Sequence, residues 1–187
     1  MFLYHIVSAQ TEKKFDTANV KNVRWQSGLL TFNDYKTIDS KTEKDDPTGY
    51  AASTSSRMAY HIWYKNKNIK FWVQNYFSYD ESSMKSWAKE NAKVLNHEQG
   101  HFDINEIYCR KFILKLKTLS LTSSFNEEII ELFDKIVEQV GEFQYQYNRQ
   151  TEDGKNVELQ KLWNEKIKQE LDLLPPVDGI IINLKVK

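Results

Sequence analysis

Alternating apolar and polar positions mark two strands in the first half of the chain. The segments 57–65, RMAYHIWYK, and 69–77, IKFWVQNYF, place large apolar residues on one face of an extended chain: Met58, Tyr60, Ile62 and Tyr64, and Ile69, Phe71, Val73 and Phe77. A period of two is typical of a strand that packs one face against a core. Only the residues NKN at 66–68 separate the two segments, which is short enough for a β-hairpin. We therefore predict a hairpin over about 57–77.

A helical period dominates the second half of the chain. Apolar residues recur at intervals of three and four positions over about 90–119, 125–147 and 157–172. Each of these segments is long enough to form several helical turns, so three long helices are predicted. Ser123 or Ser124 is placed to cap the second helix.

The remaining segments are short or polar. GLLTFNDY at 28–35 predicts a short strand that enters a turn, and the charged, Ser/Thr-rich segment 36–56 predicts a loop. A polar bridge is expected over 78–90, and the tail GIIINLKVK at 179–187 predicts a final strand. Together these elements predict an α+β fold, in which a small antiparallel sheet packs on three long helices.

The length of 187 residues suits one domain, which we place at 21–187. The first ten residues, MFLYHIVSAQ, are apolar and end in the small residues Ser8 and Ala9. They resemble the end of an export signal but lack a basic start, and they also fit a first β-strand. Residues 1–20 are therefore interpreted as the remnant of an export signal and leader, with the strand as the alternative.

Charge and composition exclude several classes of protein. Lys and Arg number 26, as do Asp and Glu, so the net charge is zero and nothing indicates a surface for nucleic acid. No apolar run reaches the length of a membrane span. Cys109 is the one cysteine, which excludes an intramolecular disulfide, and we expect it in the core. A monomer without nucleic-acid partners and without a membrane-spanning segment is expected.

The candidate chemistry lies at HEQGH on the first predicted helix. At about 100° per residue, His97 and His101 fall on one face and Glu98 falls beside it. This spacing lets two neutral imidazoles bind one Zn²⁺, while the carboxylate reaches a water on the metal and acts as its general base. The same string also arises by chance on charged helices. Gly100 would let a neighbouring strand or a substrate approach the helix backbone.

The other polar residues of this helix fall on the opposite face. Asp103, Glu106 and Arg110 are spaced to pair with one another, and we predict that they support the helix rather than bind metal. Apolar residues continue the histidine face beyond the motif: Ile104, Tyr108 and Phe112.

The segment 91–112, NAKVLNHEQGHFDINEIYCRKF, resembles the HEQGHFDI motif of a bacterial family catalogued as a domain of unknown function and described as secreted zinc-dependent proteases. The resemblance covers about 57–168 and includes KSWAKENAKVL upstream and YNRQTEDGKNVELQKLW downstream. Five downstream residues match the family pattern: Tyr147, Thr151, Gly154, Gln160 and Trp163. The resemblance implies a zincin-like fold, metallopeptidase activity and a secreted or periplasmic location.

The third zinc ligand is the point where this chain departs from that family. A zinc site of this class needs three protein ligands and keeps the fourth position for water. The family pattern has histidine where this chain has Asp153, so Asp153 is the leading third ligand, and the alternatives are Glu152, His61 and Asp103. Asp153 also fits a plain turn residue before Gly154. In that case the site would have lost a ligand and the protein would be inactive.

Two functions follow from these observations. The first is a zinc-dependent hydrolase, most simply a metallopeptidase, whose peptide or protein substrate pairs with an edge strand of the hairpin. Tyr145 or Tyr147 would then polarise the oxyanion, although both fit the core equally well. The second is a non-catalytic zincin-like module of the cell envelope that binds partners through aromatic residues of the hairpin. Those residues also fit packing under the 36–56 loop: Trp63, Trp72 and Tyr76.

Overall fold

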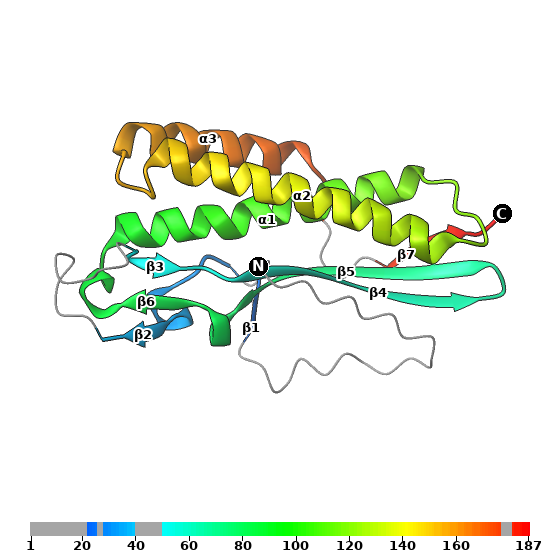
Figure 1. Cartoon of the computed structure of the whole chain (residues 1–187), viewed down its shortest axis with the longest axis horizontal. Helices are drawn as coiled ribbons and strands as arrows, with labels where there is room; N and C mark the ends of the chain where they lie inside the picture. Colours follow the sequence, from blue (N-terminus) through cyan, green and yellow to red (C-terminus); the bar gives the residue numbers. More distant parts are fainter. Residues whose placement is uncertain (1–21, 26–27, 40–49, 177–180) are drawn as a thin grey trace.

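The computed structural model describes residues 22–25, 28–39, 50–176 and 181–187. The predicted leader at 1–20 lies outside these ranges. Figure 1 shows the helices stacked as a layer over the strands. Three long helices and two small sheets form the described part, so the predicted α+β class is confirmed.

The larger sheet is built on the predicted hairpin. Strands β4 (Ser56–Lys65) and β5 (Asn68–Ser78) pair antiparallel along their whole lengths. On the other edge of β5, β1 (Asn22–Arg24) pairs with one end and β7 (Ile181–Lys185) with the other, both antiparallel. The predicted hairpin and final strand are confirmed for the residues that the structure describes.

The hairpin turn is one residue tighter than predicted. Lys65 pairs with Asn68, which leaves only Asn66 and Lys67 in the turn, at φ 51° and 61°. Two residues in the left-handed region match the right-handed twist of the flanking strands, and asparagine tolerates this region well.

A second sheet was not predicted. Strand β6 (Ser83–Lys85) lies in its centre, parallel to β2 (Lys36–Ile38) and antiparallel to β3 (Ala52–Ser53). The predicted loop 36–56 and the predicted bridge 78–90 therefore supply strands, although 40–49 lies outside the described residues. Strands of two or three residues are too short to show a period of two, which is why the sequence pattern missed them.

The predicted strand at 28–35 was wrong. Residues Phe32–Asp34 form a 3₁₀ helix, η2. The Asp34 carboxylate accepts hydrogen bonds from the backbone N–H and the hydroxyl of Thr31, at 2.6 and 2.8 Å, and these local bonds compete with an extended chain. Leu30 is buried beside this turn, and its N–H donates to Gln99 Oε1 at 2.8 Å. Two more 3₁₀ turns flank β6: η3 (Tyr79–Glu81) and η4 (Ser86–Ala88).

The three predicted helices are α1 (Ala92–Thr118), α2 (Phe125–Thr151) and α3 (Val157–Leu173). Asn91 caps α1 and Asn156 caps α3, each by accepting a backbone N–H at 3.1 Å. Ser124 is the first residue before α2, but its side chain makes no capping bond. The predicted capping serine of α2 was thus placed correctly without the expected contact.

Helix α2 continues one turn beyond the predicted end at 147. It ends where Glu152, Asp153 and Gly154 adopt φ values of 52°, 54° and 81° in succession. Three left-handed residues cannot continue a right-handed helix, so the chain turns back here into α3. The extra turn carries Asn148 and Thr151 on the helix, which matters for the site described below.

Two apolar clusters form the core, and α1 contributes to both. The larger cluster joins the inner face of the hairpin to all three helices and contains Cys109, which confirms its predicted place in the core. The smaller cluster joins the second sheet to the start of α1. Between the two clusters, four buried polar side chains bond to one another: Asn75, Asn105, Glu106 and Arg110.

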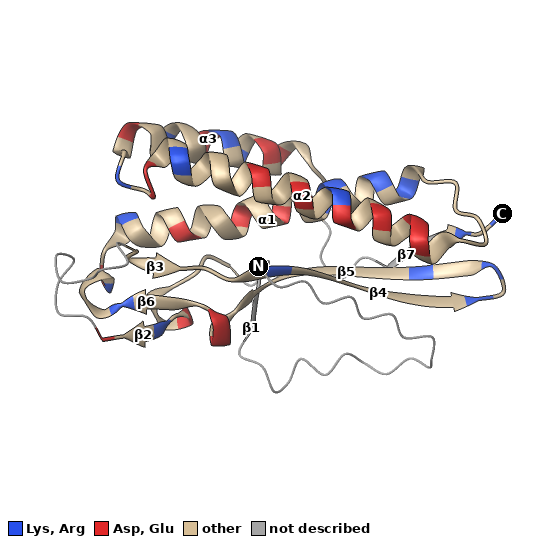
Figure 2. Cartoon of the chain, in the orientation of Figure 1, with Lys and Arg blue, Asp and Glu red and all other residues tan. Residues whose placement is uncertain are grey.

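Figure 2 shows acidic and basic residues interspersed along the helices, in agreement with the zero net charge. Among the described helices, none is both long and apolar enough to cross a membrane. The aromatic residues Trp63, Trp72 and Tyr76 of the hairpin are half-buried rather than fully exposed.

Candidate metal centre

The two histidines of the motif meet on one face of α1, as predicted. The ring centroids of His97 and His101 lie 4.8 Å apart, with the rings nearly perpendicular. Both rings line a cleft of about 300 Å³ together with Glu98 and Asp153. The opposite wall of the cleft is residues 50–54, which contain strand β3. The structure therefore brings together the predicted base, both predicted histidine ligands and the leading third ligand around one cavity.

His97 is buried and held on three sides. Its Nδ1 lies 3.0 Å from Gln160 Oε1, and its Nε2 lies 3.1 Å from Asn148 Oδ1. The ring of Tyr147 stacks on the imidazole at a centroid distance of 4.7 Å. Burial and the neighbouring His101 lower the pKa of His97, which favours the neutral imidazole that binds metals.

His101 has an equivalent set of partners. Its Nδ1 contacts Gln144 Oε1, and the Nε2 of the same glutamine donates to the His101 backbone carbonyl at 2.9 Å. Asn148 also interacts with this imidazole. Burial lowers the pKa of His101, so this ring is also favoured in its neutral form.

Glu98 lies beside the histidines with one carboxylate oxygen unsatisfied. The side chain and backbone of Thr54 hydrogen-bond the carboxylate. Oε2 is buried and has no hydrogen-bond partner among the described residues. Burial raises the pKa of Glu98, an effect opposed by Thr54 and by His97. Glu98 lines the cleft, and a side chain there with a buried carboxylate oxygen that lacks a donor is a candidate to take a proton from a bound molecule.

Asp153 is the one of the four proposed third ligands that lines the cleft with both histidines. It is close enough to Glu98 and His101 to act on the pKa values of both. It also occupies the turn before Gly154, so the two interpretations of this residue are compatible. Within the described ranges, no three His, Cys, Asp or Glu side chains form a group that could hold a metal ion as they stand.

The other three third-ligand candidates lie elsewhere. Glu152 Oε1 accepts from Asn156 at 3.3 Å, outside the cleft. His61 lies on β4, where its ring packs on Trp63 at a centroid distance of 4.3 Å. Asp103 lines a separate cavity of about 800 Å³ between α1 and α3.

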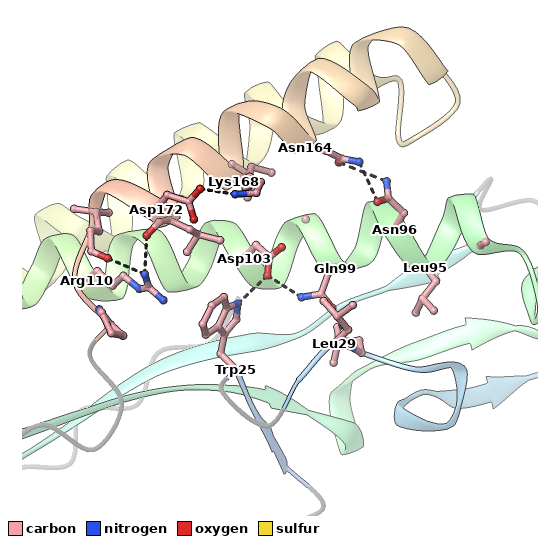
Figure 3. A pocket seen from close by; sticks show the side chains of 17 residues that line it. Trp25, Leu29, Leu95, Asn96, Gln99, Asp103, Arg110, Asn164, Lys168 and Asp172 are labelled. Atoms are coloured by element: carbon pink, nitrogen blue, oxygen red, sulfur yellow. Dashed lines mark hydrogen bonds and ion pairs between the residues drawn. The ribbon is translucent and has the colours of Figure 1, made fainter.

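Figure 3 shows the surroundings of Asp103. Its Oδ1 accepts from Trp25 Nε1 at 2.8 Å and from Gln99 Nε2 at 2.7 Å. Arg110 instead binds Glu106 at 2.9 Å. The predicted support role of this helix face is confirmed for the Glu106–Arg110 pair. The predicted pairing of Asp103 with Arg110 is replaced by its bonds to Trp25 and Gln99.

Asn148 is a site residue that the sequence pattern missed. Its Oδ1 is the polar atom that the structure places against His97 Nε2, and it lines the cleft. It was missed because the second helix was predicted to end at 147. Once α2 is known to continue, Gln144, Tyr147, Asn148 and Thr151 fall at intervals of three and four on one helical face.

Gly100 accommodates a residue of α2 rather than the strand or substrate that we predicted. A Cβ atom at this position would lie 2.2 Å from the hydroxyl oxygen of Tyr147. That hydroxyl donates to the His97 backbone carbonyl at 3.0 Å, and the Tyr147 side chain is fully buried. Tyr147 therefore packs behind the two histidines, and its hydroxyl is already hydrogen-bonded to the backbone. Tyr145 is exposed, and neither tyrosine lines the cleft.

We expect the substitution Gly100→Ala to destabilise the protein by about 1–3 kcal/mol, because the added methyl group must displace a tightly packed Tyr147. Gly141→Ala is the matched control on α2, since a Cβ at Gly141 would meet no atom of the described residues within 4 Å and alanine favours a helix. Urea unfolding of both variants measures the difference. Equal stability of the two variants would show that Tyr147 does not require the close approach.

The strand that borders the cleft is β3, and not the hairpin that we predicted as the substrate edge. β3 lies at the edge of the second sheet, with β6 as its partner. A second groove of about 470 Å³ continues from the cleft and shares three residues with it: Ser53, Thr54 and His101. An extended chain laid along β3 would therefore pass the two histidines.

Comparison with known proteins places the chain in a family. No curated protein and no solved structure matches it, so the expected likeness to zincins stays a prediction. A family model described as "Bacterial protein of unknown function (DUF922)" matches residues 33–155, which include the histidine motif, β3 and Asp153. Because this match covers more than half of its 187 residues, the chain belongs to the DUF922 family of bacterial proteins of unknown function.

Proposed function

We propose that the protein is a zinc-dependent hydrolase of the metallopeptidase type. The observation that carries the proposal is the convergence of His97, His101 and the unsatisfied Glu98 carboxylate on one cleft. The donor set fits zinc, because His97 is buried, His101 is partly buried, and the surroundings of both imidazoles favour the neutral form that zinc prefers. Zinc bound by these residues would lower the pKa of a bound water toward 7 and polarise a carbonyl oxygen.

The residues of this chain then have separate roles. His97 and His101 hold the metal, and Asp153 supplies a third ligand from the turn after α2. Glu98 accepts the proton of the attacking water through its unsatisfied oxygen and delivers it to the leaving amine. Thr54 orients the Glu98 carboxylate and belongs to the wall that also contains β3, so the base and the expected substrate edge are held together.

The test is the zinc content and zinc affinity of the purified protein. We expect one zinc ion per chain, and we expect His97→Ala and His101→Ala each to abolish tight binding, because each removes one of three protein ligands. Elemental analysis gives the content, and competition with a chromophoric chelator gives the affinity. A wild-type protein that takes up no zinc under these conditions would refute the proposal.

The same titration identifies the third ligand. Asp153→Ala weakens zinc binding strongly if Asp153 is the ligand, as we propose. Asn148→Ala is the competing variant, since Asn148 Oδ1 lies 3.1 Å from His97 Nε2. Loss of affinity in Asn148→Ala with unchanged affinity in Asp153→Ala would assign the ligand to Asn148 instead.

Export of the chain and cleavage of a peptide or protein remain parts of this proposal. A protein that folds normally but binds no zinc and cleaves no peptide would fit the alternative, a non-catalytic zincin-like module of the cell envelope. Its binding surface would then have to include the half-buried aromatic residues of the hairpin.

A further inference from the structure

We infer that Gln144 and Gln160 are positioning residues that hold both histidines in the Nδ1–H tautomer and so reserve both Nε2 atoms for a metal. The inference rests on the proposed zinc site and adds two residues from two different helices. Neither residue is a proposed metal ligand, and the spacing of the HEQGH motif does not predict either of them. Gln160 comes from α3 and Gln144 from α2, and each reaches one imidazole of α1.

The orientation of the Gln160 amide follows from its neighbours. Tyr147 donates its one hydroxyl proton to the His97 carbonyl at 3.0 Å, so its oxygen accepts from Gln160 Nε2 at 2.8 Å. The same Nε2 donates to Asn164 Oδ1 at 2.8 Å. Both amide protons are thus used, and Oε1 faces His97 Nδ1 at 3.0 Å. Only a protonated Nδ1 can complete that contact.

The orientation of the Gln144 amide is determined in the same way. Its Nε2 donates to the backbone carbonyl of His101 at 2.9 Å, and a carbonyl can only accept. Exchange of the two amide ends would place two oxygens against each other. Oε1 therefore faces His101 Nδ1, and this ring also carries its proton on Nδ1.

A neutral imidazole carries one N–H, so protonation of Nδ1 leaves the lone pair on Nε2. For His97 this Nε2 lies 3.1 Å from Asn148 Oδ1. Two acceptors cannot bond to each other, so this tautomer requires either that the Asn148 amide presents its Nδ2 to the ring in the metal-free protein or that a cation lies between the two atoms. The bonds also restrict rotation of each ring, since each glutamine is anchored through its own Nε2. Groups of this kind orient histidine ligands, and their removal typically reduces metal affinity about 10–100-fold. Both glutamines should therefore matter for zinc affinity without being ligands.

The test compares substitutions that remove the acceptor with substitutions that keep it. We expect Gln160→Leu and Gln144→Leu each to weaken zinc binding about 10–100-fold, measured by chelator competition on the full chain. Gln160→Glu and Gln144→Glu retain an oxygen that accepts from Nδ1 but lose the Nε2 donor that anchors each side chain, so we expect a clearly smaller loss of affinity than in the leucine variants. Gln146→Leu is the matched control, because Gln146 lies on the same helix as Gln144 and its amide donates to the exposed Glu142.

Nitrogen NMR of the metal-free wild type with labelled histidine gives an independent readout, at a pH where both rings are neutral. We expect His97 and His101 to show protonated Nδ1 and unprotonated Nε2. Protonated Nε2 in either ring, or leucine variants that bind zinc as tightly as the glutamate variants, would overturn the assignment. A wild type that binds no zinc refutes the proposed function instead, while the tautomers still decide the role of the glutamines.

Discussion

Glu98→Gln is expected to keep zinc at the wild-type level and to lower the rate of hydrolysis about 10²–10⁴-fold, the contribution of a general base. Glutamine has the shape of glutamate but cannot accept the proton of the attacking water. The Glu98 side chain lies beside the two histidine ligands and bonds to Thr54, so the change should leave the metal ligands in place. Removal of a carboxylate whose Oε2 receives no hydrogen bond from the part of the chain that the structure describes should also leave the fold intact.

Elemental analysis and turnover of internally quenched peptides measure the two effects on the same preparation. Glu138→Gln is the matched control, since this residue is exposed on α2 and the same change of charge should affect neither quantity. A Glu98→Gln variant that hydrolyses peptides at the wild-type rate would exclude Glu98 as the base, even if zinc is present.

Glu106→Ala is expected to lower the free energy of unfolding by about 3–5 kcal/mol, the cost of breaking a buried ion pair by removing one partner. The Glu106 side chain is 0% exposed, and its Oε1 accepts from Arg110 Nε at 2.9 Å. Its Oε2 accepts from Asn75 at 3.2 Å, which links the hairpin to α1. Without the carboxylate, the Arg110 charge stays buried and keeps the carbonyl groups at the end of α3 as acceptors, which do not neutralise it.

Urea unfolding followed by circular dichroism measures this loss. The control is Asp172→Ala, which breaks the exposed pair between Lys168 and Asp172 at the same spacing of four residues and should change stability very little. A loss in Glu106→Ala as small as in the control would mean that the buried network is not needed to join the two apolar clusters.

The local features of the site could be read from the sequence because they depend on neighbours along one helix. His97 and His101 share a face whenever this segment is helical, and α1 places them 4.8 Å apart between ring centroids. The hairpin is equally local, since Ile69, Phe71 and Val73 are fully buried and alternate with the exposed Lys70 and the half-buried Trp72. For these elements, the geometry of a helix or a strand was sufficient to predict which residues share a face.

The errors in predicting β3 and the end of α2 have a different cause. β3 has two residues and exists because β6 supplies its hydrogen-bond partners, so no pattern within 52–53 could reveal it. The end of α2 was set too early, because 148–151 are polar in sequence, and the contacts of this turn are long-range: Asn148 contacts His97 on α1, and Gln150 accepts from Trp163 on α3. Asn148 was missed for this reason.

The sequence by itself therefore determined the α+β class, the hairpin, the three helices and the face that carries His97, Glu98 and His101. These follow from periods of two and 3.6 residues, which are properties of the backbone. Only the tertiary structure decided that Gln144, Asn148 and Gln160 surround the imidazoles, that Asp153 faces the same cleft, and that β3 forms its far wall. The packing of α1 against α2, α3 and the second sheet creates these contacts between residues that are distant in the chain, and packing depends on the shapes of all the buried side chains at once.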